Sequence, residues 1–419
     1  MDKNERIIIV GAGVFGLSTA LRLKEEGYNA VTVLDRSMPP VSDGSSNDIS
    51  RIIRFDYGDT IYAAIAKEAY DLWKTNDYSD AFYSAPCFWV CQEETPEEPV
   101  QSRAQEYSEK TKRTVAEAKQ RFPQLTGELA SPGFDGFYNT AAGWADAGKA
   151  IARLASRCVR AGVSYITGFN GQVVEFEKAQ DGTITSVNTS GVFNIDGDLF
   201  IVATGAWTAS LIPAWNAMLA AGQIVGYMKL TPDEVAELRD IPIYFNFSTG
   251  FFYFPPHEGT GYLKVACHSF GYTNSNDSSI SSPPSKPPVS RANFIPQDGM
   301  IRLASGLKSI LPRFADRSFE RVGICWYNDT PTGERMFLLP LEAVFLPVLG
   351  KYAVGCLERS LSDKLLSKWK FPTQFRDRFQ SDIFTGDGSR GGPERREMTG
   401  DEKGSFDAAL TASAREAKI

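Results

Sequence analysis

The sequence predicts a two-domain fold of the α/β (more broadly α+β) class, in which a parallel-sheet domain carries an inserted antiparallel-sheet domain. Three observations support this prediction. The chain starts with an apolar strand that leads into a glycine-rich turn and a helix, and a second strand follows that helix. Between about residues 212 and 321, short β-rich runs replace this alternation. The length of 419 residues is sufficient for two or three domains.

The first element is a nucleotide-binding motif. The strand Ile7 to Val10 is followed by Gly11, Gly13 and Gly16, which have the spacing G-x-G-x-x-G. The first glycine allows a tight turn, the second lets a pyrophosphate approach the backbone, and the third lets the helix pack on the strand. The start of the helix offers N–H groups and a positive dipole end to phosphates. These features predict a Rossmann-like dinucleotide-binding domain rather than an ordinary strand–turn–helix.

The second strand ends at Asp35, about 20 residues beyond the last glycine, where a carboxylate can bond a ribose hydroxyl. We assign three neighbouring residues of these two elements to the same site: Val14, Phe15 and Arg36.

Composition excludes several classes of partner. The net charge of −7, without a dominant basic patch, argues against nucleic acid, and no apolar run has transmembrane length. The six cysteines are scattered, which predicts reduced thiols inside a cell and no metal site. The final Ala-Lys-Ile is not the S-K-L peroxisomal address, so we expect a cytoplasmic protein, and we expect a monomer.

Two later segments bear on the cofactor. Arg51 and Arg54, in the run Ser50-Arg-Ile-Ile-Arg54, are placed to meet phosphate, flavin or an anionic substrate, although an ordinary surface pair has the same spacing. The apolar strand after Asp198 ends in Ala203-Thr204-Gly205, where a glycine lets the backbone lie against a nucleotide. A dehydrogenase that uses only NAD does not need this element, so the prediction moves from NAD to FAD. Val174 and Trp207 are assigned to the same cofactor site.

The predicted domains are discontinuous. Residues 1–85, 139–211 and 322–398 are assigned to the FAD-binding domain, and residues 86–138 and 212–321 to the substrate domain. Residues 399–419 are predicted to be a disordered tail.

Several motifs together resemble a known family. The glycine motif, Ser50 to Arg54 and Ala203 to Gly205 are followed by Leu263-Lys264, by His268-Ser-Phe-Gly271, and by Gly323-Ile-Cys325-Trp-Tyr327-Asn-Asp-Thr-Pro331. In this order they resemble the monomeric sarcosine oxidase family of FAD enzymes, which includes pipecolate, saccharopine and fructosyl amino acid oxidases. The run Phe384 to Pro393 is similar to the fungal fructosyl amino acid oxidase branch.

The resemblance implies a role for each matching residue. Cys325 matches the cysteine that carries the flavin covalently; the alternative is a buried apolar thiol. Lys264 matches a lysine held near the flavin, and a lysine within an apolar strand is costly unless it is paired or functional. His268 matches an active-site histidine, the alternative being a hydrogen-bonded strand histidine.

Arg54 matches the arginine that grips the substrate carboxylate, with Arg51 and Ser50 nearer the flavin. Tyr253 and Tyr327 match pocket tyrosines.

The implied activity is oxidation of a secondary amino acid by oxygen. Oxidation of the C–N bond gives an imine, and oxygen is reduced to hydrogen peroxide. The substrate could be an N-methyl amino acid, pipecolate, saccharopine or a fructosyl amino acid.

One departure favours a second interpretation. The family has a Gly-rich turn over the flavin and a lysine that also holds the substrate carboxylate, whereas here the chain runs from Thr330 through Leu338 directly into Phe345. A truncated or non-catalytic relative without turnover therefore remains the alternative.

Overall fold

The chain was analysed as a computed structural model that describes residues 2–57, 59–90, 111–129, 135–213, 217–275, 280–284, 291–330, 343–370 and 390–416. Two predicted features fall outside these ranges. They are residues 331–342, within the segment that lacks the family's Gly-rich turn, and residues 384–389 of the run Phe384 to Pro393.

A four-stranded parallel sheet, here called the nucleotide sheet, has the order β13-β1-β2-β9. Its strands are β1 (Arg6–Val10), β2 (Ala30–Asp35), β9 (Ser164–Thr167) and β13 (Leu199–Val202). Ile7 and Ile9 face a helical layer, whereas Ile8 and Val10 face a small sheet. Burial on both faces explains why β1 reads as an uninterrupted apolar run.

The helical layer contains α1 (Val14–Glu25), α2 (Thr60–Trp73), α5 (Ala147–Arg160) and α9 (Leu346–Leu357). Asp146 caps α5, because its side chain accepts a hydrogen bond from the Lys149 N–H at 2.9 Å. The small sheet on the other face comprises β10 (Val173–Lys178), β11 (Ile184–Thr189) and β12 (Asn194–Asp196). The short helix α6 (Thr208–Leu211) contacts β10, whereas Leu365 of α10 (Asp363–Lys368) packs on the core of the helical layer.

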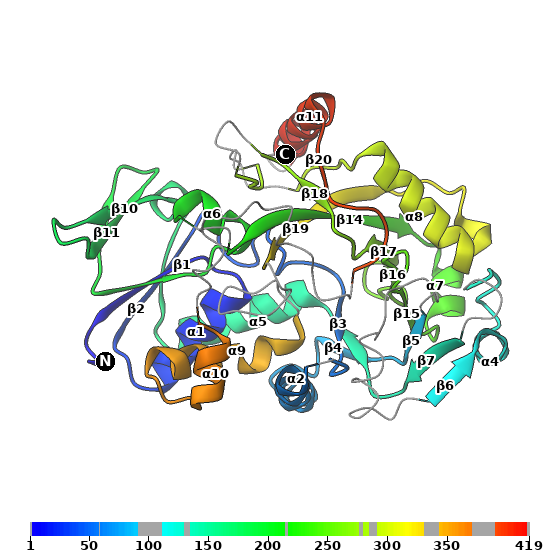
Figure 1. Cartoon of the computed structure of the whole chain (residues 1–419), viewed down its shortest axis with the longest axis horizontal. Helices are drawn as coiled ribbons and strands as arrows, with labels where there is room; N and C mark the ends of the chain where they lie inside the picture. Colours follow the sequence, from blue (N-terminus) through cyan, green and yellow to red (C-terminus); the bar gives the residue numbers. More distant parts are fainter. Residues whose placement is uncertain are drawn as a thin grey trace.

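A ten-stranded sheet, here called the large sheet, lies beside the nucleotide sheet along the long axis of the molecule (Figure 1). Its path is β20-β18-β14-β17-β16-β15-β5-β7-β6, and β19 pairs with the other edge of β14. All pairs are antiparallel except β15–β5 and β18–β20. The strands are β5 (Cys87–Val90), β6 (Thr111–Thr114), β7 (Asp135–Asn139), β14 (Leu219–Lys229), β15 (Ile243–Asn246), β16 (Phe251–Tyr253), β17 (Tyr262–Cys267), β18 (Tyr272–Thr273), β19 (Arg321–Asp329) and β20 (Arg396–Glu397).

One face of the large sheet packs on helices. Leu303, Leu307 and Ile310 of α8 (Gln297–Ile310) share a core with Tyr244 and Tyr253 of the sheet. The helices α4 (Val115–Arg121) and α7 (Pro232–Leu238) also contribute to this core. The opposite face is turned toward the segment after β2.

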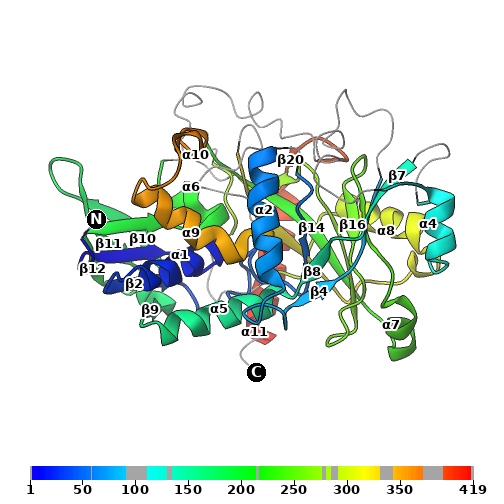
Figure 2. The ribbon, with the colours of Figure 1, turned by 90° about the horizontal axis from the view of Figure 1, so that it is seen from below.

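A third sheet, β3-β8-β4, lies between the other two layers, with α2 beside it (Figure 2). Its strands are β3 (Arg51–Ile53), β4 (Phe82–Ser84) and β8 (Gly143–Ala145). Because β3 carries Arg51, this sheet positions the predicted arginine pair between the nucleotide sheet and the large sheet.

Two of the predicted domain ranges need correction. β19 was placed in the FAD-binding range 322–398, but it pairs with β14 over nine residues, from Leu219–Asp329 to Tyr227–Arg321, so it belongs to the large sheet. The prediction of a disordered tail at 399–419 is wrong for the described part, because α11 spans Gly400–Glu416. Phe406 and Leu410 are buried in the core of the large sheet, which fixes this helix in place.

Candidate active site

The glycine motif forms a turn of closely approaching backbone. Gly11 has φ +113°, and a Cβ at this position would lie 2.4 Å from the carbonyl oxygen of Ala203, the residue that follows β13. A Cβ on Gly16 would lie 1.8 Å from the Gly11 carbonyl oxygen, so only glycine lets α1 sit this close to the turn. A Cβ on Gly13 would lie 3.1 Å from Ser46 Oγ, which itself accepts a hydrogen bond from the Val14 N–H. The predicted roles of the first and third glycines agree with this geometry.

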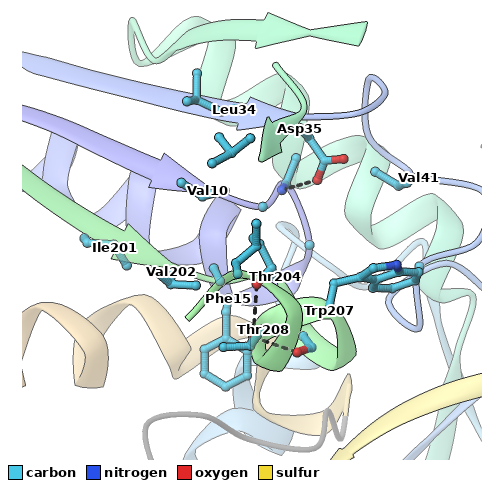
Figure 3. Close-up of a pocket in the computed structure, with 18 of the residues that line it drawn as sticks. Val10, Phe15, Leu34, Asp35, Val41, Ile201, Val202, Thr204, Trp207 and Thr208 are labelled. Atoms are coloured by element: carbon cyan, nitrogen blue, oxygen red, sulfur yellow. Dashed lines mark hydrogen bonds between the residues drawn. The ribbon is translucent and has the colours of Figure 1, made fainter. Parts of the chain in front are cut away.

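A cavity of about 550 Å³ opens at the carboxyl ends of β1, β2 and β13 (Figure 3). We call it the nucleotide cavity. The predicted cofactor residues that line it are Gly11, Gly13, Val14, Phe15, Asp35, Arg36, Val174, Ala203, Thr204, Gly205 and Trp207. This is the edge of an open parallel sheet where nucleotides bind. The residues present therefore fit the pyrophosphate and ribose of a dinucleotide.

Asp35 stabilises the turn as well as facing the cavity. Its Oδ2 accepts a hydrogen bond of 2.6 Å from the Ala12 N–H (Figure 3). Burial raises the pKa of Asp35, and the hydrogen bond from Ala12 opposes that shift. Arg36 donates two hydrogen bonds to Asp43, at 3.1 and 3.0 Å, and its guanidinium lies 4.5 Å from the centroid of the Trp207 ring. Arg36 is therefore held flat against the aromatic wall of the cavity.

A second group of residues lies on the sheet-facing side of the segment after β2. Lys264 Nζ donates to Asp48 Oδ2 at 2.8 Å and to the Ser50 carbonyl oxygen at 2.6 Å. Tyr227 donates to Asp48 Oδ1 at 2.9 Å, and Arg291 donates to the Tyr227 hydroxyl at 3.2 Å. Arg51 lies 3.3 Å from Asp48 Oδ2. These five side chains, Asp48, Arg51, Tyr227, Lys264 and Arg291, form what we call the Asp48 cluster.

The cluster holds three cations around one carboxylate, away from water. Lys264 is 1 % exposed and Asp48 is 6 % exposed. Burial lowers the pKa of Lys264 to about 8, although the Asp48 carboxylate favours its charged form. Burial acts to raise the pKa of Asp48, but the charges of Lys264, Arg51 and Arg291 outweigh it and hold that pKa well below its usual range. A buried lysine with a lowered pKa is a typical feature of a functional site.

Cys325 lies at the edge of this cluster. Arg51 Nη2 donates to Cys325 Sγ at 3.1 Å, and it also donates to the Ser45 carbonyl oxygen at 2.8 Å. The thiol is 1 % exposed, and Gln223 of β14 lies opposite Cys325 in the strand register. Cys325 thus lies in contact with the predicted flavin arginine, between the nucleotide sheet and the large sheet.

Arg54 and His268 are separated from the Asp48 cluster by aromatic rings. The Arg54 guanidinium lies 4.5 Å from the Tyr57 ring centroid and 4.9 Å from that of Trp89, and it donates to the Asp56 carbonyl oxygen. His268 lies 6.0 Å from both Phe245 and Tyr327, measured between ring centroids. The structure therefore connects Arg54 and His268 through Trp89 and Phe245, whose centroids are 5.6 Å apart.

The structure gathers some predicted residues and separates others. Ser50, Arg51, Lys264 and Cys325 lie together at the Asp48 cluster, outside the lining of the nucleotide cavity. Tyr327 lies two residues after Cys325 on β19 and therefore on the same face of the large sheet. Tyr253, the other predicted pocket tyrosine, lies on the opposite, helix-covered face, where it is fully buried and its ring centroid is 5.8 Å from that of Tyr244. Its neighbour Phe252 takes the place on the site-facing side, packed near Cys325.

Asp48, Tyr227 and Arg291 were missed by the sequence reasoning. Asp48 lies two residues before Ser50, so a search for the counter-charge of a buried lysine could have found it. Tyr227 and Arg291 have no local signal. Within the described ranges, no group of three or more His, Cys, Asp and Glu side chains could hold a metal ion. No helix in the described part of the chain is both long and apolar enough to cross a membrane.

Comparison with known proteins finds relatives that cover most of the chain. The sequence model of the family described as "FAD dependent oxidoreductase" matches residues 6–353. The L-saccharopine oxidase of Schizosaccharomyces pombe is 24 % identical over 408 residues, covering 87 % of this chain and 92 % of that protein. The amino acid oxidase imqH of Aspergillus flavus is 25 % identical, covering 89 % of this chain and 98 % of that protein.

Among solved structures, fructosamine oxidase (Amadoriase II) of Aspergillus fumigatus superposes with a TM-score of 0.83 at 25 % identity, covering 94 % of this chain and 96 % of that one. Amadoriase I of the same organism gives a TM-score of 0.81 at 25 % identity, covering 96 % and 98 %. The predicted two-domain fold, the resemblance and the choice of FAD over NAD are thereby confirmed.

Proposed function

Because the chain belongs to the FAD dependent oxidoreductase family, we propose that it oxidises a secondary amino acid at its C–N bond and reduces oxygen to hydrogen peroxide. The observation that carries this proposal is Lys264, a fully buried lysine held by Asp48 beside Arg51 and Cys325. When bound, FAD accepts the hydride equivalent from the carbon next to the amine and passes its electrons to oxygen.

The residues of this chain would hold the cofactor at two places. Gly11, Gly13 and the start of α1 suit the pyrophosphate, and Asp35 suits the ribose. At the other end, Cys325 is the residue for a covalent bond to the cofactor, and Arg51 is in contact with its sulfur at 3.1 Å.

Lys264 supplies positive charge where oxygen is reduced. Its low exposure removes competing water, so its charge acts strongly on the negative charge that develops on oxygen. Asp48 and the Ser50 carbonyl fix the ammonium in one position, which makes them positioning groups.

Arg54 is proposed to bind the substrate carboxylate. Its planar fork matches a carboxylate in two hydrogen bonds, and stacking on Tyr57 and Trp89 orients that fork. His268 lies at the other side of the same rings, where it can contact the amine. Water then hydrolyses the released imine to a carbonyl compound and a primary amine.

The alternative is a relative that binds FAD without turnover, favoured by the direct run from Thr330 to Phe345 in the sequence. A monomeric state and a cytoplasmic location also remain proposals, which size-exclusion chromatography and cell fractionation would test.

The test is the visible spectrum of the purified protein before and after acid precipitation, followed by a peroxide assay with secondary amino acids. Yellow colour that stays with the precipitated protein is expected for wild type, and Cys325→Ala should release it. Cys267→Ala is the matched control, because Cys267 is buried on the helix-covered face of the large sheet. Flavin released from wild type would refute the covalent bond, and bound flavin without peroxide would favour the non-catalytic alternative.

A further inference from the structure

The site-facing side of the large sheet is continuous from Cys325 to Trp89. Side chains two residues apart on a strand share a face, so Cys325 and Tyr327 point to the same side. Phe252 and Tyr327 both pack against the buried cluster that contains Cys325 and Ala266. The region next to Cys325 can therefore be followed along the sheet, strand by strand.

Beyond the Asp48 cluster, this side is built from rings. His268 lies 6.0 Å from Tyr327 and 6.0 Å from Phe245, measured between ring centroids. Phe245 lies 4.7 Å from Phe247 and 5.5 Å from Phe252. We call these residues the aromatic face: Trp89, Phe245, Phe247, Phe252, His268 and Tyr327. The spacings are those of favourable ring pairs.

The aromatic face is only partly covered, in contrast to the other side of the same sheet. Phe247, Phe252, His268 and Tyr327 are half-buried. On the helix-covered side, Phe88, Tyr244 and Tyr253 are all 0 % exposed. Trp89 and Phe245 belong to a buried core cluster on which Phe247 and Phe252 pack, and the half-buried rings of the aromatic face keep surface that a ligand can contact.

The polar groups of this face are few. Trp89 is 4 % exposed, and its indole N–H has no hydrogen-bond partner in the described part of the chain. The nearby Asp329 carboxylate is occupied by Arg390 at 2.5 Å and by Arg395 at 3.0 Å. A sugar with many hydroxyls, placed on these rings, would lose hydrogen bonds to water without replacing most of them.

We propose that the substrate is an N-alkylated aromatic amino acid, with its carboxylate on Arg54 and its ring against Phe247, Phe252 and Tyr327. This inference rests on the proposed oxidase function and names its substrate class. An aromatic substrate buries apolar area on these rings and gains favourable ring–ring contacts, which a polyol or a chain with a second carboxylate does not.

The experiment uses titration calorimetry without oxygen on the purified full chain, whose bound FAD is reduced with dithionite beforehand so that it cannot oxidise the ligand. Binding is then read separately from turnover. N-methyl-L-phenylalanine is compared with N-methyl-L-cyclohexylalanine, which has similar size but no aromatic ring, and with fructosyl-glycine. We expect N-methyl-L-phenylalanine to bind at least about tenfold more tightly than N-methyl-L-cyclohexylalanine or fructosyl-glycine. Equal or tighter binding of fructosyl-glycine, or no binding of the aromatic ligand by protein that retains its flavin, overturns the inference.

Substitution locates the binding surface. Phe252→Leu is expected to weaken binding of the aromatic ligand about tenfold and binding of N-methylglycine by a smaller factor. Phe169→Leu is the matched control, since Phe169 is 63 % exposed in the turn before β10, far along the sequence from the aromatic face. Flavin content and thermal melting verify that each variant folds. An unchanged affinity in folded Phe252→Leu contradicts the proposal.

A peroxide assay separates the two proposals. Aromatic binding without peroxide supports the substrate class and refutes the oxidase function. Peroxide formation with a higher kcat/KM for fructosyl-glycine supports the oxidase function and refutes the aromatic substrate.

Discussion

In the nucleotide cavity, the glycine turn and Asp35 lie close together in the sequence, whereas the Asp48 cluster consists of side chains from distant segments. Gly11, Gly13 and Asp35 lie within 25 residues of each other in the chain. Asp48 and Lys264 are 216 residues apart. The first site depends on close packing, and the second on charge balance. Substitutions should therefore harm the two sites in different ways.

The largest expected effect comes from removing the central charge. Asp48→Asn leaves Lys264 and Arg51 buried without their counter-charge, which should lower the free energy of unfolding by about 3–5 kcal/mol. Urea unfolding measures the loss. Asp71→Asn is the control, because the Lys67–Asp71 pair is more than half exposed and should change stability by less than about 0.5 kcal/mol. A similar small loss in Asp48→Asn would show that the cluster contributes little.

The lowered pKa of Lys264 predicts a pH dependence of stability. Burial lowers this pKa from 10.5 to about 8, so between these values the unfolded chain binds more protons than the folded chain. The contribution of Lys264 to the free energy of unfolding therefore rises with pH, by up to about 1.4 kcal/mol per pH unit in that window. Unfolding of wild type and Lys264→Met is compared from pH 7.5 to 10. A difference that stays constant with pH would contradict the assignment.

Close packing is tested by Gly16→Ala. The new Cβ would lie 1.8 Å from the Gly11 carbonyl oxygen, so the turn must shift, at a cost of about 1–3 kcal/mol. In a Cys325→Ala background, where no covalent bond retains the cofactor, we expect Gly16→Ala to weaken FAD binding about 10- to 100-fold, as measured by flavin fluorescence during dialysis. Gly404→Ala, also in a helix but with nothing within 4 Å of its Cβ, should retain FAD and gain slight stability. Full flavin content in Gly16→Ala would refute the packing argument.

The smallest effect concerns α11, which packs on the large sheet and touches neither site. The Thr399 hydroxyl accepts from the Glu402 N–H at 3.2 Å, and Glu402 accepts from the Thr399 N–H at 2.8 Å. Thr399→Ala should cost about 1 kcal/mol in urea unfolding, with flavin content and activity unchanged. Loss of flavin in this variant would mean that α11 stabilises the site as well as the sheet.

Local patterns made much of the nucleotide side predictable. The turn around Gly11 to Gly16 and the strand that ends at Asp35 both rest on contacts within a few residues, and they are present as expected. α11 was missed although its signals are local: Thr399 and Glu402 form a capping box, and Phe406 and Leu410 have helical spacing.

The large sheet was predictable only in outline. Which of Phe252 and Tyr253 faces the site depends on strand register, and a shift of one residue reverses the answer. Tyr227 lies opposite Lys264 because β14 pairs with β17, a pairing that composition and spacing do not encode, and Arg291 joins the cluster by donating to the Tyr227 hydroxyl. The excess of cations around Asp48 likewise exists only after folding.

β14 pairs with β17 on one edge and with β19 on the other, which sets Tyr227 opposite Lys264 and Gln223 opposite Cys325. The separation between Lys264 and Cys325 is therefore fixed by a strand that contributes no ring to the aromatic face. Phe245 and Phe252 lie on β15 and β16, beyond β17. During evolution, substrate preference can change by substitution on those outer strands while the geometry of the reactive groups is inherited intact.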